Sequence, residues 1–184
     1  MSVPDVQLET PRLILRPPRR EDFDAWAAFM ADAERTRYIG GAQPRPVAWR
    51  GFASMVGAWV LQGYAMFSVI EKASGRWVGR VGPWQPEGWP GPEVGWSLVA
   101  QAGGKGYATE AATAAIDWAF DALDWREVIH TIDPANEPSK AVARRLGSGF
   151  VRTGRLPPPF DSSEVEVWGQ PREAWLARRR EARA

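Results

Sequence analysis

Residues 101–110 read QAGGKGYATE and follow directly on the apolar run Val94–Ala100. Three glycines and a lysine fill positions 103–106, and a run of good helix formers comes next. Glycine lets the backbone bend sharply and approach a ligand closely, and the first turn of a helix presents unpaired N–H groups at the positive end of its dipole. A strand, a glycine-rich turn and a helix start therefore meet at one place, which suits a phosphate-bearing ligand.

The glycine spacing discriminates between classes of phosphate loop. A P-loop needs Gly-Lys followed by Ser or Thr, but Gly106 stands at that position, and Val99 stands where its first glycine belongs. A dinucleotide fingerprint needs a third glycine at the position of Thr109. The pattern that is met is Gln/Arg-x-x-Gly-x-Gly/Ala, through Gln101, Gly104 and Gly106. A tight strand-to-helix turn without a ligand is the alternative.

The composition is that of an ordinary globular protein: 184 residues, 45% hydrophobic, 24% charged, with a formal net charge of +1. Such a balance gives no global field for nucleic acid or membrane, and we expect Arg178–Arg180 to be a solvated helix face. The chain has no cysteine and one histidine, His130, which excludes disulfides and a cysteine nucleophile and argues against a metal site. No apolar run approaches the ~20 residues of a membrane span, and the N-terminus does not read as a signal peptide. We therefore expect a cytoplasmic protein.

Hydrophobic periodicity predicts one domain over residues 1–184, with its core at about 8–168 and a charged helix at 172–184. The predicted strands cover 10–16, 64–70, 76–81, 93–100, 128–132, 150–155 and 164–168. Predicted helices begin at an Asp22 cap, near Pro46, behind the glycine loop and at Pro138. A strand–helix–strand unit within a mostly antiparallel set implies a mixed α/β sheet with helices on both faces.

A second motif follows the strand at 128–132. Residues 133–147 read DPANEPSKAVARRLG: an asparagine after a strand, a serine three residues on, and a helix ending in Leu-Gly. Together with QAGGKGYATE, and with TPRLILR at 10–16, this motif resembles the GCN5-related N-acetyltransferase (GNAT) superfamily. The resemblance covers about residues 8–168 and extends to the RimJ/RimL branch, which modifies ribosomal-protein N-termini.

The resemblance implies a GNAT fold, with a mostly antiparallel sheet of six to seven strands that is splayed at its central parallel pair. Acetyl-CoA is then the co-substrate, with its pyrophosphate on the glycine loop and its pantetheine arm paired with strand edges in the splay. Asn136 stands at the mouth of that gap, and Lys140, Arg144 or Lys105 is expected to meet the 3′-phosphate. A helix cap is the alternative role for Asn136 and Ser139. The residues expected to contact the cofactor are Leu98, Val99, Gln101, Gly103, Gly104, Lys105, Gly106, Tyr107, Ala108, Thr109, Asn136, Ser139, Lys140 and Arg144.

Acetyl transfer to an amine needs a base, a donor to the thioester oxygen and an acid for the thiolate. Glu93 starts the strand before the glycine loop beside a tryptophan-rich segment, where burial raises the pKa of a carboxylate toward neutrality. A solvated carboxylate is the alternative. The backbone N–H of Leu98 or Val99 is the expected donor. The tyrosine that often protonates the thiolate in this superfamily is replaced by Ala143, so the resemblance leaves Ser139 or water for that role.

The predicted activity is direct transfer, in a ternary complex, to a primary amine on a protein N-terminus or a small molecule. An amine antibiotic as acceptor and a non-catalytic acyl-CoA sensor are the alternatives, and a homodimer is compatible with either. His130 is expected to be a packed strand residue, and Ser148-Gly149 extends the loop after the last core helix. The acceptor pocket is expected among tryptophans that can equally be ordinary core residues, namely Trp49, Trp59, Trp84, Trp89 and Trp96.

Overall fold

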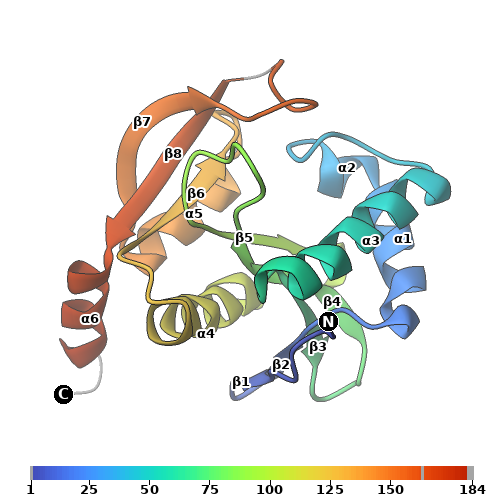
Figure 1. Cartoon of the computed structure of the whole chain (residues 1–184), viewed down its shortest axis with the longest axis horizontal. Coiled ribbons are helices and arrows are strands. Elements are labelled where there is room, and N and C mark those ends of the chain that lie inside the picture. The colour runs from blue at the N-terminus through green and yellow to red at the C-terminus, as the bar shows by residue number, and fades with distance from the viewer. Residues whose placement is uncertain (1, 163, 182–184) are drawn as a thin grey trace.

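Eight strands form one sheet, with helices on both of its faces (Figure 1). The structure is a computed structural model that describes residues 2–162 and 164–181. The strands are β1 (Leu8–Glu9), β2 (Leu13–Arg16), β3 (Phe67–Glu71), β4 (Trp77–Trp84), β5 (Glu93–Leu98), β6 (Glu127–Ile132), β7 (Gly149–Arg155) and β8 (Glu164–Pro171). Their order across the sheet is β1-β2-β3-β4-β5-β6-β8-β7.

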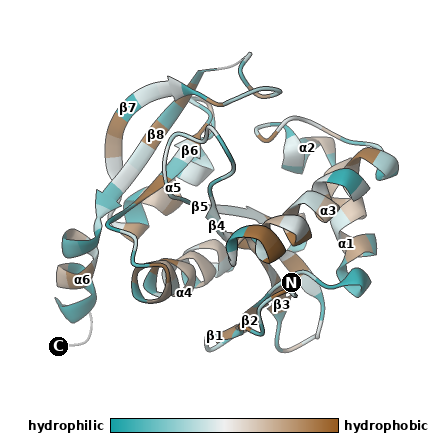
Figure 2. Cartoon of the chain, in the orientation of Figure 1, coloured by the Kyte–Doolittle hydropathy of each residue, from teal (hydrophilic) through white to brown (hydrophobic). Residues whose placement is uncertain are grey.

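The helices are α1 (Phe23–Ala31), α2 (Ala33–Thr36), α3 (Arg45–Gln62), α4 (Tyr107–Ala122), α5 (Glu137–Leu146) and α6 (Arg172–Glu181), with 3-10 turns at Arg20–Asp22 and Ala100–Ala102. α1 packs on α3 and on β4, whereas α4 packs on β4 and β5. Figure 2 shows apolar segments on the central strands and on α3, while α6 is mostly hydrophilic. Within the described residues, no helix is long and apolar enough to cross a membrane.

The expected mixed, mostly antiparallel sheet is confirmed, because each neighbouring pair is antiparallel except β5 and β6. The sheet has one strand more than the expected six to seven, since β1 pairs two residues with β2. Two residues are too few to show a hydrophobic period. The four-residue helix α2 is also absent from the sequence prediction; its N-cap Asp32 accepts hydrogen bonds from the N–H groups of Glu34 and Arg35.

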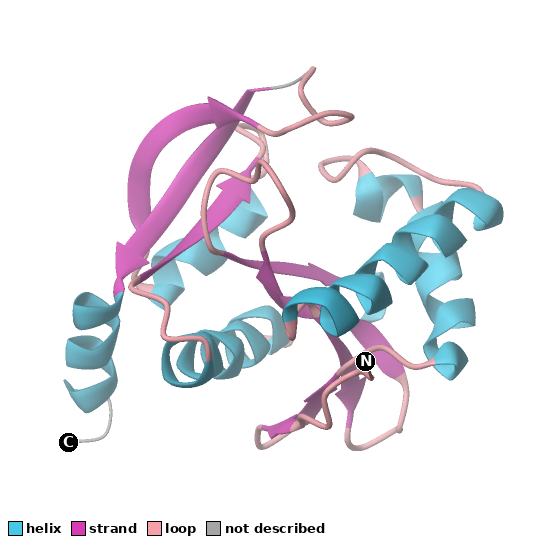
Figure 3. Cartoon of the chain, viewed as in Figure 1, coloured by secondary structure: helices cyan, strands magenta, loops and turns pink. Residues whose placement is uncertain are grey.

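The sheet opens between its two central parallel strands. β5 and β6 are paired only at Glu93 and Ile129, whereas β6 pairs with β8 along six residues. Figure 3 shows the result: β1 to β5 and β6 to β8 form two groups of strands that diverge from one another. This is the splay that the sequence predicts at the central parallel pair.

Helix α4 covers the sheet beneath this opening. Its buried residues are Tyr107, Ala111, Ala112, Ala115, Ile116, Ala119 and Phe120. Alanine at four of these positions lets the helix approach the strands closely, as its sequence pattern predicts. The chain that enters α4 is the glycine loop, so this packing fixes the loop at the end of β5.

Asp22 does not cap α1 as predicted, because its own backbone is already helical and its side chain makes no cap hydrogen bond. Its carboxylate instead accepts both Nη groups of buried Arg16, at 2.7 and 2.8 Å. It also accepts the Ser68 hydroxyl at 2.7 Å and the Arg19 N–H at 2.8 Å. The residue therefore joins β2 and β3 to the start of α1.

Two further predictions need correction. Helical spacing predicts an apolar side of α3 made of Trp49, Phe52, Ala53, Val56, Trp59 and Val60, whereas its buried residues are Ala48, Phe52, Met55 and Trp59. Trp49 and Ala53 are exposed and lie off the buried face. The arginines of α6 are not all solvated, because Arg178 donates to a carbonyl of α5 and Arg179 pairs with Asp117 at 2.8 Å. Buried Trp175 donates to the same Asp117 carboxylate at 2.7 Å. α6 ends at Glu181, and residues 182–184 of the predicted helix lie outside the described residues.

We predict that Asp22→Ala destabilises the protein by about 3–5 kcal/mol, because it leaves the Arg16 guanidinium buried without its partner. Thermal or denaturant unfolding followed by circular dichroism measures the loss. Glu21→Ala is the matched control, since that neighbouring carboxylate is 70% exposed and lies 3.5 Å from the same arginine. It should change stability by less than about 1 kcal/mol. Equal effects of the two substitutions would contradict the assignment.

Candidate active site

Glu93 is a buried carboxyl at the point where β5 and β6 part. Its side chain contacts β6 and the preceding loop, and the residue is 6% exposed. One oxygen, Oε2, accepts hydrogen bonds from Trp89 Nε1 and from Thr131 Oγ1, both at 2.7 Å. Burial raises the pKa of Glu93 to about 7, against the lowering effect of these two donors. The residue can therefore exchange a proton near neutral pH, and the solvated alternative does not hold.

Two of the five candidate tryptophans gather around this carboxyl. Trp84 lies opposite Glu93 in the β4–β5 register, and its ring meets that of Trp89 edge-on, with centroids 6.3 Å apart. Trp59 is fully buried in the core, and Trp96 lies on the opposite face of β5 by strand alternation. Fewer tryptophans therefore surround the carboxyl than the sequence predicts.

The backbone of β5 presents alternate residues to the opening. Val99 donates its N–H to the Val78 carbonyl at 3.0 Å. This N–H therefore points toward β4 and is not available to the thioester oxygen, although the sequence predicts it as a donor there. By the alternation of an antiparallel ladder, the N–H of Leu98 faces the other way, toward β6. Of the two expected donors to the thioester oxygen, the N–H of Leu98 is therefore the remaining candidate.

A side chain replaces the missing backbone pairing next to this opening. His130 on β6 is buried, and its Nδ1–H donates to the Val94 carbonyl of β5 at 2.6 Å. That assignment leaves Nε2 as the acceptor for the Ser148 hydroxyl at 2.9 Å, and the Ser148 oxygen in turn accepts from Gln170 at 3.0 Å. Burial lowers the pKa of His130 to about 4, so the ring is neutral. His130 is a structural residue, as expected.

The glycine loop begins α4 without a side-chain cap. Gly104 and Gly106 have φ angles of 73° and 78°, which favour glycine. The hydrogen-bond ladder of the helix starts with the Glu110 N–H and the Gly106 carbonyl, at 3.0 Å. The N–H groups of residues 107–109 therefore have no intrahelical partner and can receive an anion.

Two carboxylates hold this loop from either side. Glu110 accepts Thr10 Oγ1 at 2.6 Å and Arg12 Nε at 2.6 Å, and Arg12 also donates to the Lys105 carbonyl at 2.9 Å. Glu71 accepts the Tyr107 hydroxyl at 2.8 Å. Thr10 and Arg12, at the start of the first strand motif, therefore position the glycine loop. The sequence pattern alone does not reveal this role.

The second motif lies across the opening at the start of α5. The Asn136 side chain accepts the Ser139 N–H at 3.2 Å, so the cap alternative holds for Asn136. It does not hold for Ser139, whose hydroxyl accepts Trp96 Nε1 of β5 at 3.3 Å. The side-chain amino group of Asn136 stays available as a donor, and Ser139 keeps its hydroxyl proton.

The three cationic side chains expected to bind the 3′-phosphate differ in their exposure and in how many of their hydrogen-bond donors are already engaged. Lys140 Nζ already has acceptors for its three hydrogens, the Pro134 carbonyl at 2.7 Å, Glu166 at 2.9 Å and Glu137 at 3.3 Å. Of the three cations it is the most fully engaged within the protein, and its assignment to the phosphate stays a prediction. Arg144 is 56% exposed and lies over the Trp168 ring. Lys105 is 47% exposed and 3.4 Å from Glu71.

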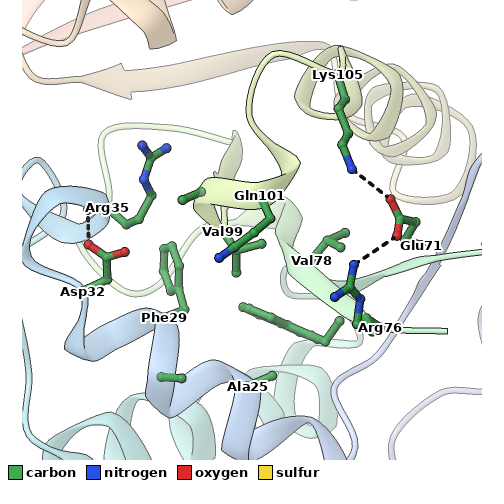
Figure 4. A pocket seen from close by; sticks show the side chains of 13 residues that line it. Ala25, Phe29, Asp32, Arg35, Glu71, Arg76, Val78, Val99, Gln101 and Lys105 are labelled. Atoms are coloured by element: carbon green, nitrogen blue, oxygen red, sulfur yellow. Dashed lines mark hydrogen bonds and ion pairs between the residues drawn. The ribbon is translucent and has the colours of Figure 1, made fainter. Parts of the chain in front are cut away.

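A cavity of about 350 Å³ lies on the α1 side of the loop. In Figure 4, Gln101 points into it, and Lys105 and Arg76 reach the carboxylate of Glu71 from two sides. Glu93, Asn136 and Ser139 do not line this cavity. The side chains of Gln101 and Lys105 are thus directed away from the opening between β5 and β6. If these residues contact a ligand in the opening, they do so through backbone groups.

Thr131 and Ser148 are the site residues that sequence reasoning misses. Thr131 alternates with His130 on β6, but its partner Glu93 lies 38 positions earlier. Ser148 belongs to the two-residue extension, which we place in the loop, and it is buried there against His130. Only the unusual Leu-Gly-Ser-Gly-Phe spacing marks it in the sequence.

Comparisons with known proteins agree with this geometry. A family model described as "Acetyltransferase (GNAT) domain" matches residues 12–148. The chain is similar to an uncharacterized N-acetyltransferase, p20, of Bacillus licheniformis, with 32% identity over 152 residues that cover 81% of this chain and 84% of that protein.

Solved structures extend the comparison. An acetyltransferase from Agrobacterium tumefaciens shares 33% identity at a TM-score of 0.77, covering 92% of this chain and 95% of that one. A ribosomal-protein-S5-alanine acetyltransferase from Vibrio fischeri superposes with a TM-score of 0.71 at 19% identity, covering 93% and 99%. At that identity the second likeness shows the fold alone.

The raised pKa of Glu93 makes a prediction about stability. Its ordinary pKa is 4.5 and its folded pKa is about 7, so its contribution to stability is fully present below pH 4.5 and is lost as the pH rises through 7. Glu93→Gln should therefore stabilise the protein at pH 8 by roughly 2–4 kcal/mol, at about 1.4 kcal/mol per pKa unit. The glutamine oxygen can still accept from Trp89 and Thr131.

Denaturant unfolding of both proteins at pH 4.5 and pH 8 tests this. The difference in unfolding free energy should be small at the lower pH and grow toward the higher one. A difference that does not depend on pH would contradict a buried carboxyl with a raised pKa. Glu87→Gln, in the exposed part of the same loop, is the control.

Proposed function

The chain belongs to the GNAT acetyltransferase family, and on this premise we propose that it transfers an acetyl group from acetyl-CoA to a primary amine, with Glu93 as general base. Acetyl-CoA is the co-substrate of the family. The observation that carries the proposal is Glu93 itself, a buried carboxyl with a pKa of about 7 at the mouth of the β5–β6 opening. A base with this pKa takes a proton from an ammonium group near neutral pH.

The residues around the opening fit an acyl-CoA. The unpaired N–H groups of residues 107–109 and the left-handed Gly104 and Gly106 form a cradle for a pyrophosphate. The free edge of β5 offers backbone groups to the amides of a pantetheine arm. The Asn136 amino group is a further donor, and Arg144 is the exposed cation that we assign to the 3′-phosphate. Acetyl-CoA supplies the activated thioester.

The chain's own residues then account for the protons. Glu93 takes one from the acceptor amine, whose nitrogen attacks the thioester carbon, so that a C–N bond forms and the C–S bond breaks. The Leu98 N–H stabilises the charge on the thioester oxygen. We assign protonation of the leaving thiolate to Ser139, because Ala143 offers no hydroxyl; the Ser139 oxygen regains a proton from the attacking nitrogen, which loses its second proton as the amide forms. The hydrogen bond from Trp96 to the Ser139 oxygen favours loss of its proton.

For the acceptor we propose a primary amine on a protein N-terminus or a small molecule, in keeping with the RimJ/RimL resemblance. A panel of N-terminal peptides, amino acids and amines, assayed for release of free CoA, tests this directly. Release with at least one amine supports the enzyme. Binding of acetyl-CoA without release for any amine would instead identify an acyl-CoA sensor, which Ala143 in the usual tyrosine position favours.

Glu93→Gln should lower kcat by about 10²–10⁴-fold at pH 7 while the affinity for acetyl-CoA stays unchanged, since only the proton acceptor is lost. Its pH–rate profile should lack the rise near pH 7 that we expect of the wild type. Steady-state kinetics and calorimetry measure the two quantities, with Glu87→Gln as control. Full activity of Glu93→Gln would remove this residue as the base.

Gly104→Val should weaken acetyl-CoA binding by more than about tenfold, because valine resists the left-handed backbone of the cradle. Gly63→Val is the matched control: it has a φ of 81° at the end of α3 and, like Gly104, has no atom within 4 Å of an added Cβ. Both variants should lose similar stability, about 1–2 kcal/mol. Calorimetry that finds equal affinities in the two variants would contradict the assignment of the loop.

A further inference from the structure

The carboxyl of Glu93 is held from both sides of the opening through one of its two oxygens. Trp89, in the loop before β5, donates its Nε1–H to Oε2 at 2.7 Å. Thr131, on β6, donates its hydroxyl to the same Oε2, also at 2.7 Å. The loop and β6 belong to the two groups of strands that diverge at this point. The carboxyl is therefore tied to both groups.

The other oxygen, Oε1, has no such donor. Both hydrogen bonds to Glu93 reach Oε2, and Oε1 is not among the fully buried polar atoms without a partner in the described part of the chain. Oε1 therefore keeps contact with solvent, although the residue as a whole is 6% exposed. It lies beside Gly95, where an added Cβ would come within 3.1 Å of it. The two oxygens of this carboxyl thus have different surroundings.

Both donors are built into the scaffold. The backbone N–H of Trp89 donates to the Pro86 carbonyl at 3.0 Å, and the Trp84 ring meets the Trp89 indole edge-on. Arg152 on β7 donates to the Pro90 carbonyl of the same loop at 3.3 Å. The hydroxyl donor on β6 lies in the regular ladder between β6 and β8. Neither donor depends on a freely rotating long side chain.

The groups that surround the carboxyl act on its charge in opposite directions. Burial is the largest influence and raises the pKa of Glu93, whereas the hydrogen bonds from Thr131 and Trp89 lower it. Arg80 on β4 is the charged residue of the described chain that also lowers this pKa. From the segment before β3, apolar Met66 packs at the glycine next to Oε1. A donor to a carboxylate favours its charged form, so the two neutral donors limit the effect of burial.

We propose that Trp89 and Thr131 are positioning residues of the reaction, which hold Oε2 of Glu93 so that the proton is exchanged at Oε1. This rests on the proposed function, in which Glu93 is the base. Two hydrogen bonds from opposite sides fix the plane of the carboxyl, and a fixed acceptor is what proton transfer from a bound amine requires. The same pair stabilises the carboxylate and so sets the pH above which the base is free.

Thr131→Val removes the hydroxyl donor and keeps a branched side chain. The midpoint of the kcat/KM pH profile should rise by about one pH unit, so that kcat/KM falls about fivefold at pH 7 and recovers above pH 9. Trp89→Phe should shift the profile in the same direction, and Thr131→Ser should restore that of the wild type. The controls are Thr153→Val, exposed on β7, and Trp125→Phe, packed edge-on to Tyr64.

Unfolding in denaturant provides a readout that does not depend on turnover. The ordinary pKa of Glu93 is 4.5 and its folded pKa is about 7, so its contribution to stability is lost as the pH rises through 7. Loss of a donor raises the folded pKa further. The denaturant midpoint of Thr131→Val should therefore lie further below that of the wild type at pH 9 than at pH 5. In a Glu93→Gln background the deficit should be the same at both pH values.

A loss of stability and of kcat/KM that is the same at every pH would overturn the proposal, because a merely structural threonine gives that result. A Thr131→Ser profile that matches Thr131→Val would also overturn it. A pH-dependent deficit in stability with an unshifted rate profile would show that the donors hold Glu93 and that Glu93 is not the base. That outcome, or absence of CoA release from every amine, would remove the proposed function.

Discussion

The separation of β5 from β6 after a single residue pair is the constraint on which the rest of the structure depends. A sheet that opens in its middle exposes backbone groups that water or a ligand must satisfy. The chain satisfies one of them itself, through His130 and the Val94 carbonyl. A second tie, from Trp96 to Ser139, joins β5 to the first turn of α5. Both bonds use side chains, so the strands stay joined while the remaining edge of β5 stays open to a bound chain of amides.

The glycine loop depends on this opening and on its own anchors. α4 places the loop at the end of β5, and the carboxylates of Glu71 and Glu110 hold it against β2 and β3. Ionised carboxylates suit this task, because their partners lower their pKa values and keep them charged. Glu93 differs from both because burial outweighs its two hydrogen bonds. Environment alone therefore separates two structural glutamates from one that can exchange a proton.

The sequence predicts those features that depend on local spacing. The glycine loop, the alanine face of α4 and the direction of the Glu93 pKa shift all follow from residues within about one turn or strand of each other. Residues with partners elsewhere in the chain are harder to judge: Asp22 is held by Arg16 and also by Ser68, 46 positions away, and Lys140 pairs with Glu166, 26 positions away. The local sequence fits a capping role of Asp22 as well as an ion pair, and it fits a phosphate-binding role of Lys140 as well as an ion pair. The choice is made by tertiary contacts, which spacing does not encode.

Two acidic side chains, Asp22 and Glu93, are buried beside this sheet with opposite consequences for their charge. Glu93 is buried where its charged form is disfavoured, and both of its hydrogen-bond donors, Trp89 and Thr131, are neutral. Nearby, Arg16 and Asp22 show that the same fold can bury a fully paired charge. Since such costs persist mainly at functional sites, the contrast with Asp22 supports the proposal that Glu93 exchanges a proton with the acceptor amine.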